Sequence, residues 1–351
     1  MSGGLGLEQR YRRVLRLLPG YYRDQWEEDM VAAFLDSWLT GDPDDDECIL
    51  EFCKPTWPEV ASVAALAARL YLGGAATPRR YFAWGQAVRR AVLTVVLMHA
   101  VLGLDVLVRT AWSHRLFGLP APPASLAFAF AAPGGVWPSV YDLVNVAWVV
   151  IFVTLALGHY RTARVLAVLA IVPGLAALLQ AQVTGIMPAP FGRWAWWVLF
   201  DLALVVAMAA FHSDAPPPAR LPWLLALPAG YLLVYGPVLA LLATGNSAWL
   251  PDWPGVCCLL VALACLVHVP RAWSRQAGGP GVWSLTLVLL AAVFGAFRIF
   301  TLAGYLHDPH LLKVSLAELV ILVAAAALVA PDAARAQAAA PAPPYPGAMA
   351  A

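Results

Sequence analysis

Long apolar segments recur through most of this chain, and they restrict its possible folds more than any other feature. A helix needs about 20 apolar residues to cross a bilayer. About eight segments qualify by this rule, at residues 90–109, 138–158, 163–183, 194–211, 221–243, 254–270, 282–305 and 311–330. The sequence therefore predicts an all-α fold, that of a polytopic integral membrane protein with about eight transmembrane helices.

The composition agrees with this class. Hydrophobic residues make up 61% of the chain and charged residues 12%, whereas soluble domains carry about 25% charged residues. So little charge leaves too little polar surface to keep 351 residues in water. A net charge of +1 also excludes the dense basic surface that neutralises nucleic-acid phosphates. The lipid bilayer is therefore the first expected partner, and nucleic acid is not expected.

The beginning of the chain differs from the rest, because most of its 21 acidic residues lie before residue 60. Apolar residues recur there at helical spacing, and Pro19-Gly20 interrupts the pattern. A second helix is expected to end before Gly41, followed by an acidic solvated loop, GDPDDDE. A third begins with the capping box Thr56-Trp57-Pro58-Glu59 and ends at Gly73-Gly74. These signals predict a small cytoplasmic three-helix domain.

The predicted domains follow from these patterns. Residues 1–78 form the cytoplasmic helical domain and residues 79–330 form the transmembrane domain. Residues 331–351 are rich in Ala and Pro and lack apolar periodicity, so they predict a disordered cytoplasmic tail.

Orientation follows from basic residues near the spans, which favour the cytoplasmic side. With the amino terminus inside, the following face the cytoplasm: Arg79, Arg80, Arg89, Arg90, Arg161, Arg164, Arg220, Arg271, Arg275 and Arg335. Fewer would face outward, namely Arg109, Arg115, Arg193 and Lys313. This bias predicts a multi-pass protein of the cell membrane with both termini in the cytoplasm.

The order of residues from Tyr11 to Met30, YRRVLRLLPGYYRDQWEEDM, resembles the amino-terminal signature of HAAS-type domains. The likeness covers about residues 7–74. Such domains precede the membrane spans of some bacterial permease-like proteins, and the high Ala, Leu, Arg and Pro content resembles actinobacterial proteins. The resemblance implies a signalling or partner-contact role, often beside PadR-like regulators, and no catalytic residues. The docking candidates it implies are Tyr11, Leu15, Leu18, Tyr22, Arg23, Glu27 and Met30.

Ionisable residues inside the spans are costly and suggest function. Asp201, Arg298 and Glu318 are expected at similar depth, about 12–14 Å from the outer ends of their helices at 1.5 Å per residue. Arg298 and Glu318 lie on consecutive antiparallel helices, so the sequence predicts an ion pair whose guanidinium Asp201 can share. One interpretation is a structural ion pair, another is an outward-opening site for a cation, proton or small polar ligand, and a third is charge facing a water-filled cavity. His99 is expected to be a hydrogen-bonded core residue.

Catalytic and nucleotide-binding motifs are absent from the sequence. It contains no G-x-x-x-x-G-K-[ST], no H-E-x-x-H and no G-x-S-x-G. We therefore expect no enzyme activity, no cofactor and no metal site. The leading hypothesis is a bacterial inner-membrane protein of regulatory or sensory type, whose amino-terminal domain docks a cytoplasmic regulatory protein. The alternative is a transporter or permease subunit with a polar site in the outer half of the membrane.

Overall fold

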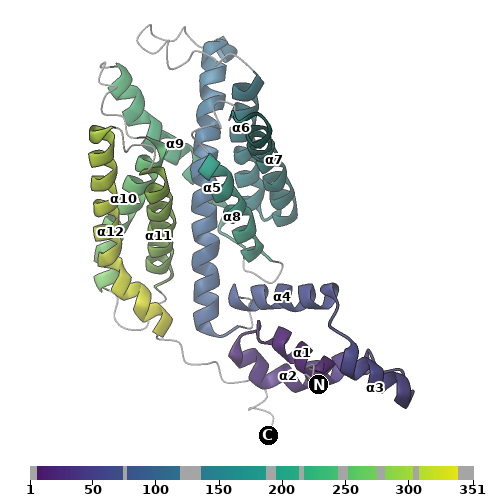
Figure 1. The fold of residues 1–351 in the computed structure, drawn as a ribbon. Helices are drawn as coiled ribbons and strands as arrows, with labels where there is room; N and C mark the ends of the chain where they lie inside the picture. Colours follow the sequence, from purple (N-terminus) through teal and green to yellow (C-terminus); the bar gives the residue numbers. More distant parts are fainter. Residues whose placement is uncertain are drawn as a thin grey trace. The chain divides into compact units, whose positions relative to one another are not determined.

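The structure is a computed structural model, and the residues it describes are all helical or irregular, without a strand (Figure 1). They are residues 6–73, 77–118, 136–186, 195–212, 217–243, 252–274, 281–302 and 308–338. The chain divides into an amino-terminal unit that ends at Gly85 and a membrane unit over Gln86–Ala340. The all-α prediction is confirmed for these residues, and the first boundary lies a few residues beyond the predicted 78.

The amino-terminal unit has four helices before the division, where three were predicted. They are α1 (Leu7–Leu15), α2 (Gly20–Asp36), α3 (Pro43–Phe52) and α4 (Trp57–Tyr71). The prediction of an acidic loop at residues 41–47 was wrong, because α3 begins at Pro43 within this segment. Asp42 caps that helix by accepting a hydrogen bond from the Asp44 N–H at 3.2 Å, and Pro43 suits its first turn. The acidic residues that follow favour the positive end of the helix dipole.

Aromatic stacking and a helix cap hold this unit together. The rings of Tyr11 and Phe34 stack with centroids 3.8 Å apart. The predicted capping box of α4 is confirmed, because the Glu59 carboxylate accepts the Thr56 N–H at 2.6 Å. It also accepts the indole N–H of Trp38 at 2.9 Å. Partial desolvation opposes ionisation, but these donors outweigh it and lower the pKa of Glu59 below its ordinary value.

The first turns of α5 (Arg79–Ser113) belong to the amino-terminal unit. The Tyr81 ring lies 5.2 Å from Tyr21 and 5.8 Å from Tyr71. A Cβ at Gly85 would lie 1.7 Å from the carbonyl oxygen of Leu72, so only glycine allows α5 to approach the end of α4 this closely. This contact explains why the unit extends past residue 78.

The membrane unit contains the remainder of α5 and seven further α-helices in the described residues. They are α6 (Val136–Leu157), α7 (Tyr160–Thr184), α8 (Ala195–Ala207), α9 (Arg220–Ala243), α10 (Trp253–Ser274), α11 (Val282–Leu302) and α12 (Pro309–Ala338). Within the described residues, 7 helices are long and apolar enough to cross a membrane. The chain is therefore a multi-pass membrane protein by the length and composition of its helices.

The exception is α8, which covers part of the predicted span 194–211. Its 13 residues extend only about 20 Å at 1.5 Å per residue, and a 3-10 turn (Met208–Ala210) follows. Two arginines from other helices bind the carbonyls at this end. Arg89 donates to the Ala210 carbonyl at 3.3 Å, and Arg164 donates to the carbonyls of Met208 and Phe211. These cations satisfy carbonyls that a longer helix would have bonded internally.

Two groups of helices make up most of the membrane unit (Figure 1). Helices α10, α11 and α12 pack closely together, and α6 and α7 form an antiparallel hairpin. Helix α8 lies against both α7 and α11. The core is continuous through these helices and includes Trp148, Phe152, Met208, Phe294 and Leu322.

The predicted tail begins too early. Helix α12 continues through Pro331 to Ala338, and Asp332 and Ala333 beyond the proline are buried. Membrane helices tolerate such a proline when neighbours satisfy the freed carbonyls, and the Trp273 indole N–H donates to the Leu328 carbonyl at 3.3 Å. Residues 339–351 lie outside the described residues, as do Arg193 and Arg275 from the orientation argument.

Candidate functional site

The predicted ion pair between Arg298 and Glu318 is present, and it joins α11 to α12. One guanidinium nitrogen, Nη2, donates to the Glu318 carboxylate. The other, Nη1, donates to both carboxylate oxygens of Asp252 at 2.8 and 2.7 Å. The side chains of Arg298 and Glu318 are only 3% and 6% exposed. This cluster therefore connects three helices, because one guanidinium donates hydrogen bonds to two carboxylates.

Asp252 was not predicted as a site residue because it lies between the predicted spans 221–243 and 254–270. Its carboxylate caps α10 by accepting the Gly255 N–H at 3.0 Å. The signal was available, since Asp followed by Trp-Pro-Gly is a typical helix start. Gly255 also has no room for a side chain, because a Cβ there would lie 2.4 Å from a Glu318 carboxylate oxygen. The backbone of α10 and the carboxylate are therefore in direct contact.

A second buried polar chain links the same three helices near their other ends. The Ser284 hydroxyl donates to the Asp332 carboxylate at 2.5 Å, and Nε2 of His268 lies 3.1 Å from the same hydroxyl oxygen. All three residues are buried. Serine is the central member, whereas a hydrolytic triad places histidine between serine and aspartate. The arrangement connects helices, and the sequence held no local signal for it.

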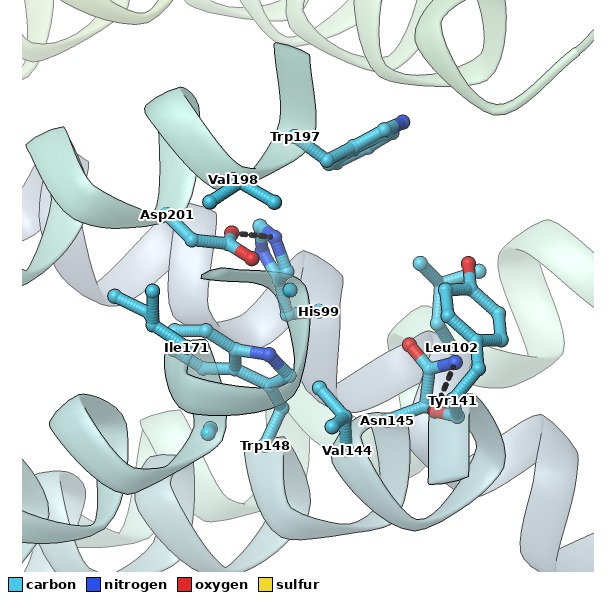
Figure 2. Close-up of a pocket in the computed structure, with 12 residues that line it drawn as sticks. His99, Leu102, Tyr141, Val144, Asn145, Trp148, Ile171, Trp197, Val198 and Asp201 are labelled. Carbon is cyan, nitrogen blue, oxygen red and sulfur yellow. Dashed lines mark hydrogen bonds and ion pairs between the residues drawn. The ribbon is translucent and has the colours of Figure 1, made fainter. Parts of the chain in front are cut away.

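Asp201 does not share the guanidinium of Arg298, so that part of the prediction was wrong. Its Oδ1 instead lies 3.0 Å from Nε2 of His99 on α5 (Figure 2). The reason is the orientation of α8. Trp197 and Phe200 face α11 and pack against Phe297, with ring centroids 4.5 and 5.0 Å away. The Asp201 carboxylate points into a cavity bounded by α5, α6, α7 and α8.

The pair of His99 and Asp201 borders this cavity, whose volume is about 50 Å³. Figure 2 shows the two side chains on one side of it and Tyr141 and Asn145 on another. The rings of Trp148 and Trp197 flank the imidazole, 4.8 and 5.7 Å from its centroid. Polar groups thus line a largely apolar space in the middle of the membrane unit.

The hydrogen bonds of His99 fix its protonation. Nδ1 lies 2.9 Å from the Val95 carbonyl oxygen, and because a carbonyl only accepts, Nδ1 must carry a proton. Nε2 then faces Asp201 with a lone pair unless a second proton lies between them. Among the described residues, neither Nε2 nor the Asp201 oxygen has a well-aligned hydrogen bond. The prediction of a hydrogen-bonded core histidine is confirmed for Nδ1.

The predicted docking residues lie mostly in the core of the amino-terminal unit. Three are buried: Tyr11, Leu15 and Leu18. Two more are half-buried and pack against the same core: Tyr22 and Met30. Arg23 and Glu27 are half-buried as well, and Glu27 lies 3.5 Å from Arg12. Buried side chains cannot contact a partner, so the three core residues are corrected from docking candidates to structural ones.

Exposed apolar side chains of this unit gather elsewhere. Phe52 is 68% and Trp57 84% exposed, at the end of α3 and the start of α4. The Arg10 guanidinium fixes this turn by donating to the Phe52 carbonyl at 3.2 Å and to the Cys53 carbonyl. Helix α3 itself carries Asp44, Asp45, Asp46, Glu47 and Glu51. We call Phe52, Trp57 and these acidic residues the α3 face.

Comparisons with known protein families, with curated proteins and with solved structures found no match. The resemblance of residues 7–74 to HAAS-type domains therefore stays a prediction.

Proposed function

We propose that the protein is a bacterial inner-membrane protein of regulatory or sensory type, and that its amino-terminal unit docks a cytoplasmic regulatory protein. The observation that carries this proposal is the α3 face. A tryptophan that is 84% exposed beside a run of carboxylates contributes nothing to the core of its own unit. Tryptophan is enriched at the centres of protein interfaces.

Charge selects the kind of partner. The carboxylates of α3 repel the anionic cytoplasmic surface of a membrane, and they attract lysine and arginine. The partner segment that fits is therefore basic, with an apolar residue to cover Phe52 and Trp57. The early turns of α5 supply a route for a signal, since this helix begins in the amino-terminal unit and continues as the first membrane helix.

Photo-crosslinking in native membranes tests the docking role. The full chain should capture a specific cytoplasmic protein, and a chain lacking residues 1–78 should lose it. The double substitution Phe52→Ala and Trp57→Ala should remove most of the capture, because Ala truncation of a central aromatic costs about 2 kcal/mol or more of binding. Leu17→Ala is the matched control, since Leu17 is 48% exposed on the same unit and is not part of the α3 face. An unchanged partner in the double variant would refute the proposal.

We also propose that both termini face the cytoplasm, which the bias of arginines supports. The topology depends on whether α8 crosses the membrane. Seven crossings place the two termini on opposite sides, and eight place them on the same side. Accessibility of single cysteines placed at Ser2 and after Ala338 to a membrane-impermeant thiol reagent tests this. Labelling of only one of them in intact cells would contradict the proposed topology.

A transporter subunit is the second candidate function, and the His99–Asp201 cavity favours it. Buried ionisable groups beside a cavity in a membrane bundle are typical of substrate or ion pathways. Uptake into proteoliposomes that depends on Asp201 would support this function. Uptake that is absent while partner capture persists would support the regulatory one.

A further inference from the structure

We propose that the cavity lined by His99, Asn145 and Asp201 binds a small organic ammonium ion. The proposal concerns the membrane unit alone. It does not depend on docking by the amino-terminal unit, and it gives a ligand class to the cavity whichever of the two functions holds.

The polar groups in the cavity are predominantly acceptors. Asp201 presents its carboxylate. The Asn145 amide donates from Nδ2 to the Tyr141 carbonyl at 3.1 Å, which leaves its Oδ1 as an acceptor. Figure 2 shows this oxygen on the side of the amide that faces away from the Tyr141 carbonyl. With the ring proton on Nδ1, which faces the Val95 carbonyl, Nε2 of His99 is an acceptor too. A ligand that satisfies all three must donate, as an ammonium group does with its N–H bonds.

The apolar part of the lining suits the carbon skeleton of such a ligand. Trp148, Ile171 and Val198 line the cavity together with Trp197. Aromatic faces attract cations, an effect worth about 2 kcal/mol when water is excluded. Trp148 is buried, at 1% exposure. A cavity of about 50 Å³ holds a compact organic cation of a few non-hydrogen atoms, since one water needs about 10–15 Å³.

Other ligand classes fit this lining less well. An anion would meet the Asp201 carboxylate, and among the described lining residues His99 alone can carry positive charge. A divalent metal would need several hard oxygen or imidazole ligands, and the described residues contain no group of three such side chains. A purely apolar ligand would leave the carboxylate desolvated without compensation.

An ammonium ion brings one positive charge to the Asp201 carboxylate. Titratable groups around the imidazole come from α6, which contributes Tyr141, and from α8, which contributes Asp201. Helix α7 contributes only Ala170, Ile171 and Gly174 to the lining, and Asp105, paired with Arg109 at 2.7 Å, lies further along α5.

The test uses the full chain in lipid nanodiscs with methylamine as the probe and methanol as its neutral isostere. Calorimetry should give saturable binding of the amine and none of the alcohol. Asp201→Asn should weaken the amine by about tenfold or more, the usual loss for a charged hydrogen bond. Asp201→Glu should retain binding, and Asp142→Asn, a carboxylate on α6 outside the lining, should leave it unchanged. Equal binding of amine and alcohol, or no saturable binding of either, would overturn the proposal.

Discussion

In the membrane unit, the buried charges around Arg298 and those around His99 are hydrogen-bonded to different degrees. Around Arg298, two carboxylates hold the guanidinium at hydrogen-bonding distance, and Gly255 brings backbone directly against Glu318. Around His99, one carboxylate lies at 3.0 Å without a well-aligned hydrogen bond, beside open space. Burying either group of charges costs free energy. A difference in how fully the charges are hydrogen-bonded therefore indicates a difference in role.

The comparison separates structural charge from charge that is available to a ligand. A buried guanidinium that donates hydrogen bonds to two carboxylates fixes the arrangement of the helices that carry them. A buried carboxylate that borders a cavity retains the capacity to bind something else. The depth of a residue in the membrane does not distinguish the two cases, since Asp201 and Arg298 were expected at similar depth. Each prediction below tests whether this division holds.

The largest effect is expected from breaking the Arg298 cluster. Arg298→Met leaves Glu318 and Asp252 as uncompensated carboxylates, and Glu318 is almost fully buried. Removing one partner of a buried pair costs about 3–5 kcal/mol. Reversible unfolding in mixed micelles should show a loss of this size. Adding Glu318→Leu should recover part of it, because the second change removes one orphaned charge.

A stability loss below about 1 kcal/mol for Arg298→Met is the value of a solvated surface pair. It would show that the Arg298 cluster does not hold the three helices together. Asp142→Asn serves as the control for a carboxylate change in the same unit, outside both groups.

A smaller loss is expected at the other end of the same three helices. Ser284→Ala removes the hydroxyl that donates to Asp332 and lies 3.1 Å from His268. Disrupting a buried hydrogen bond costs about 1–3 kcal/mol. Thr286→Val is the matched control, because the Thr286 hydroxyl donates only within its own helix, to the Val282 carbonyl. Equal losses in the two variants would show that the polar chain does not connect the helices.

The His99 pair should respond least among the buried groups. In Asp201→Asn, the new amide can donate to Nε2 of a neutral His99, so the contact survives in another form. We expect the unfolding free energy to change by less than about 1 kcal/mol, the value of one neutral hydrogen bond. The same micelle unfolding assay checks this. A loss as large as that of Arg298→Met would place Asp201 among the structural charges and would weaken the ligand argument.

Much of the fold follows from the sequence, because span length and helix caps are local signals. The long spans were predictable from apolar length, and the cap of α4 from Thr56 and Glu59. The start of α3 at Asp42 and Pro43 was equally local and was overlooked because acidic residues suggested a loop. The contact of Asp201 with His99 was not predictable, because it depends on which face α8 turns toward α5. Packing between helices distant in the chain sets that rotation, and neither residue type nor depth records it.

The smallest predicted effect is the acid sensitivity of the amino-terminal unit. It must be separated from the stability changes that are measured for the membrane variants. The pKa of Glu59 is lowered in the folded state by the donors at the start of α4, against partial desolvation. A group with a lowered pKa stabilises the fold above its ordinary pKa, here 4.5, and loses that contribution as pH falls through the folded value. The amino-terminal unit should therefore weaken below about pH 4.5.

Glu59→Gln isolates this term, because glutamine keeps an acceptor oxygen and does not titrate. We expect a loss of about 0.5 kcal/mol at pH 7 and a flatter dependence of stability on pH between 3 and 5, measured by thermal unfolding of the full chain. Glu47→Gln is the control, since Glu47 lies exposed on α3. If acid weakens the Glu59→Gln protein as steeply as the native one, the titrating group lies elsewhere. The two membrane clusters must then be compared only at neutral pH.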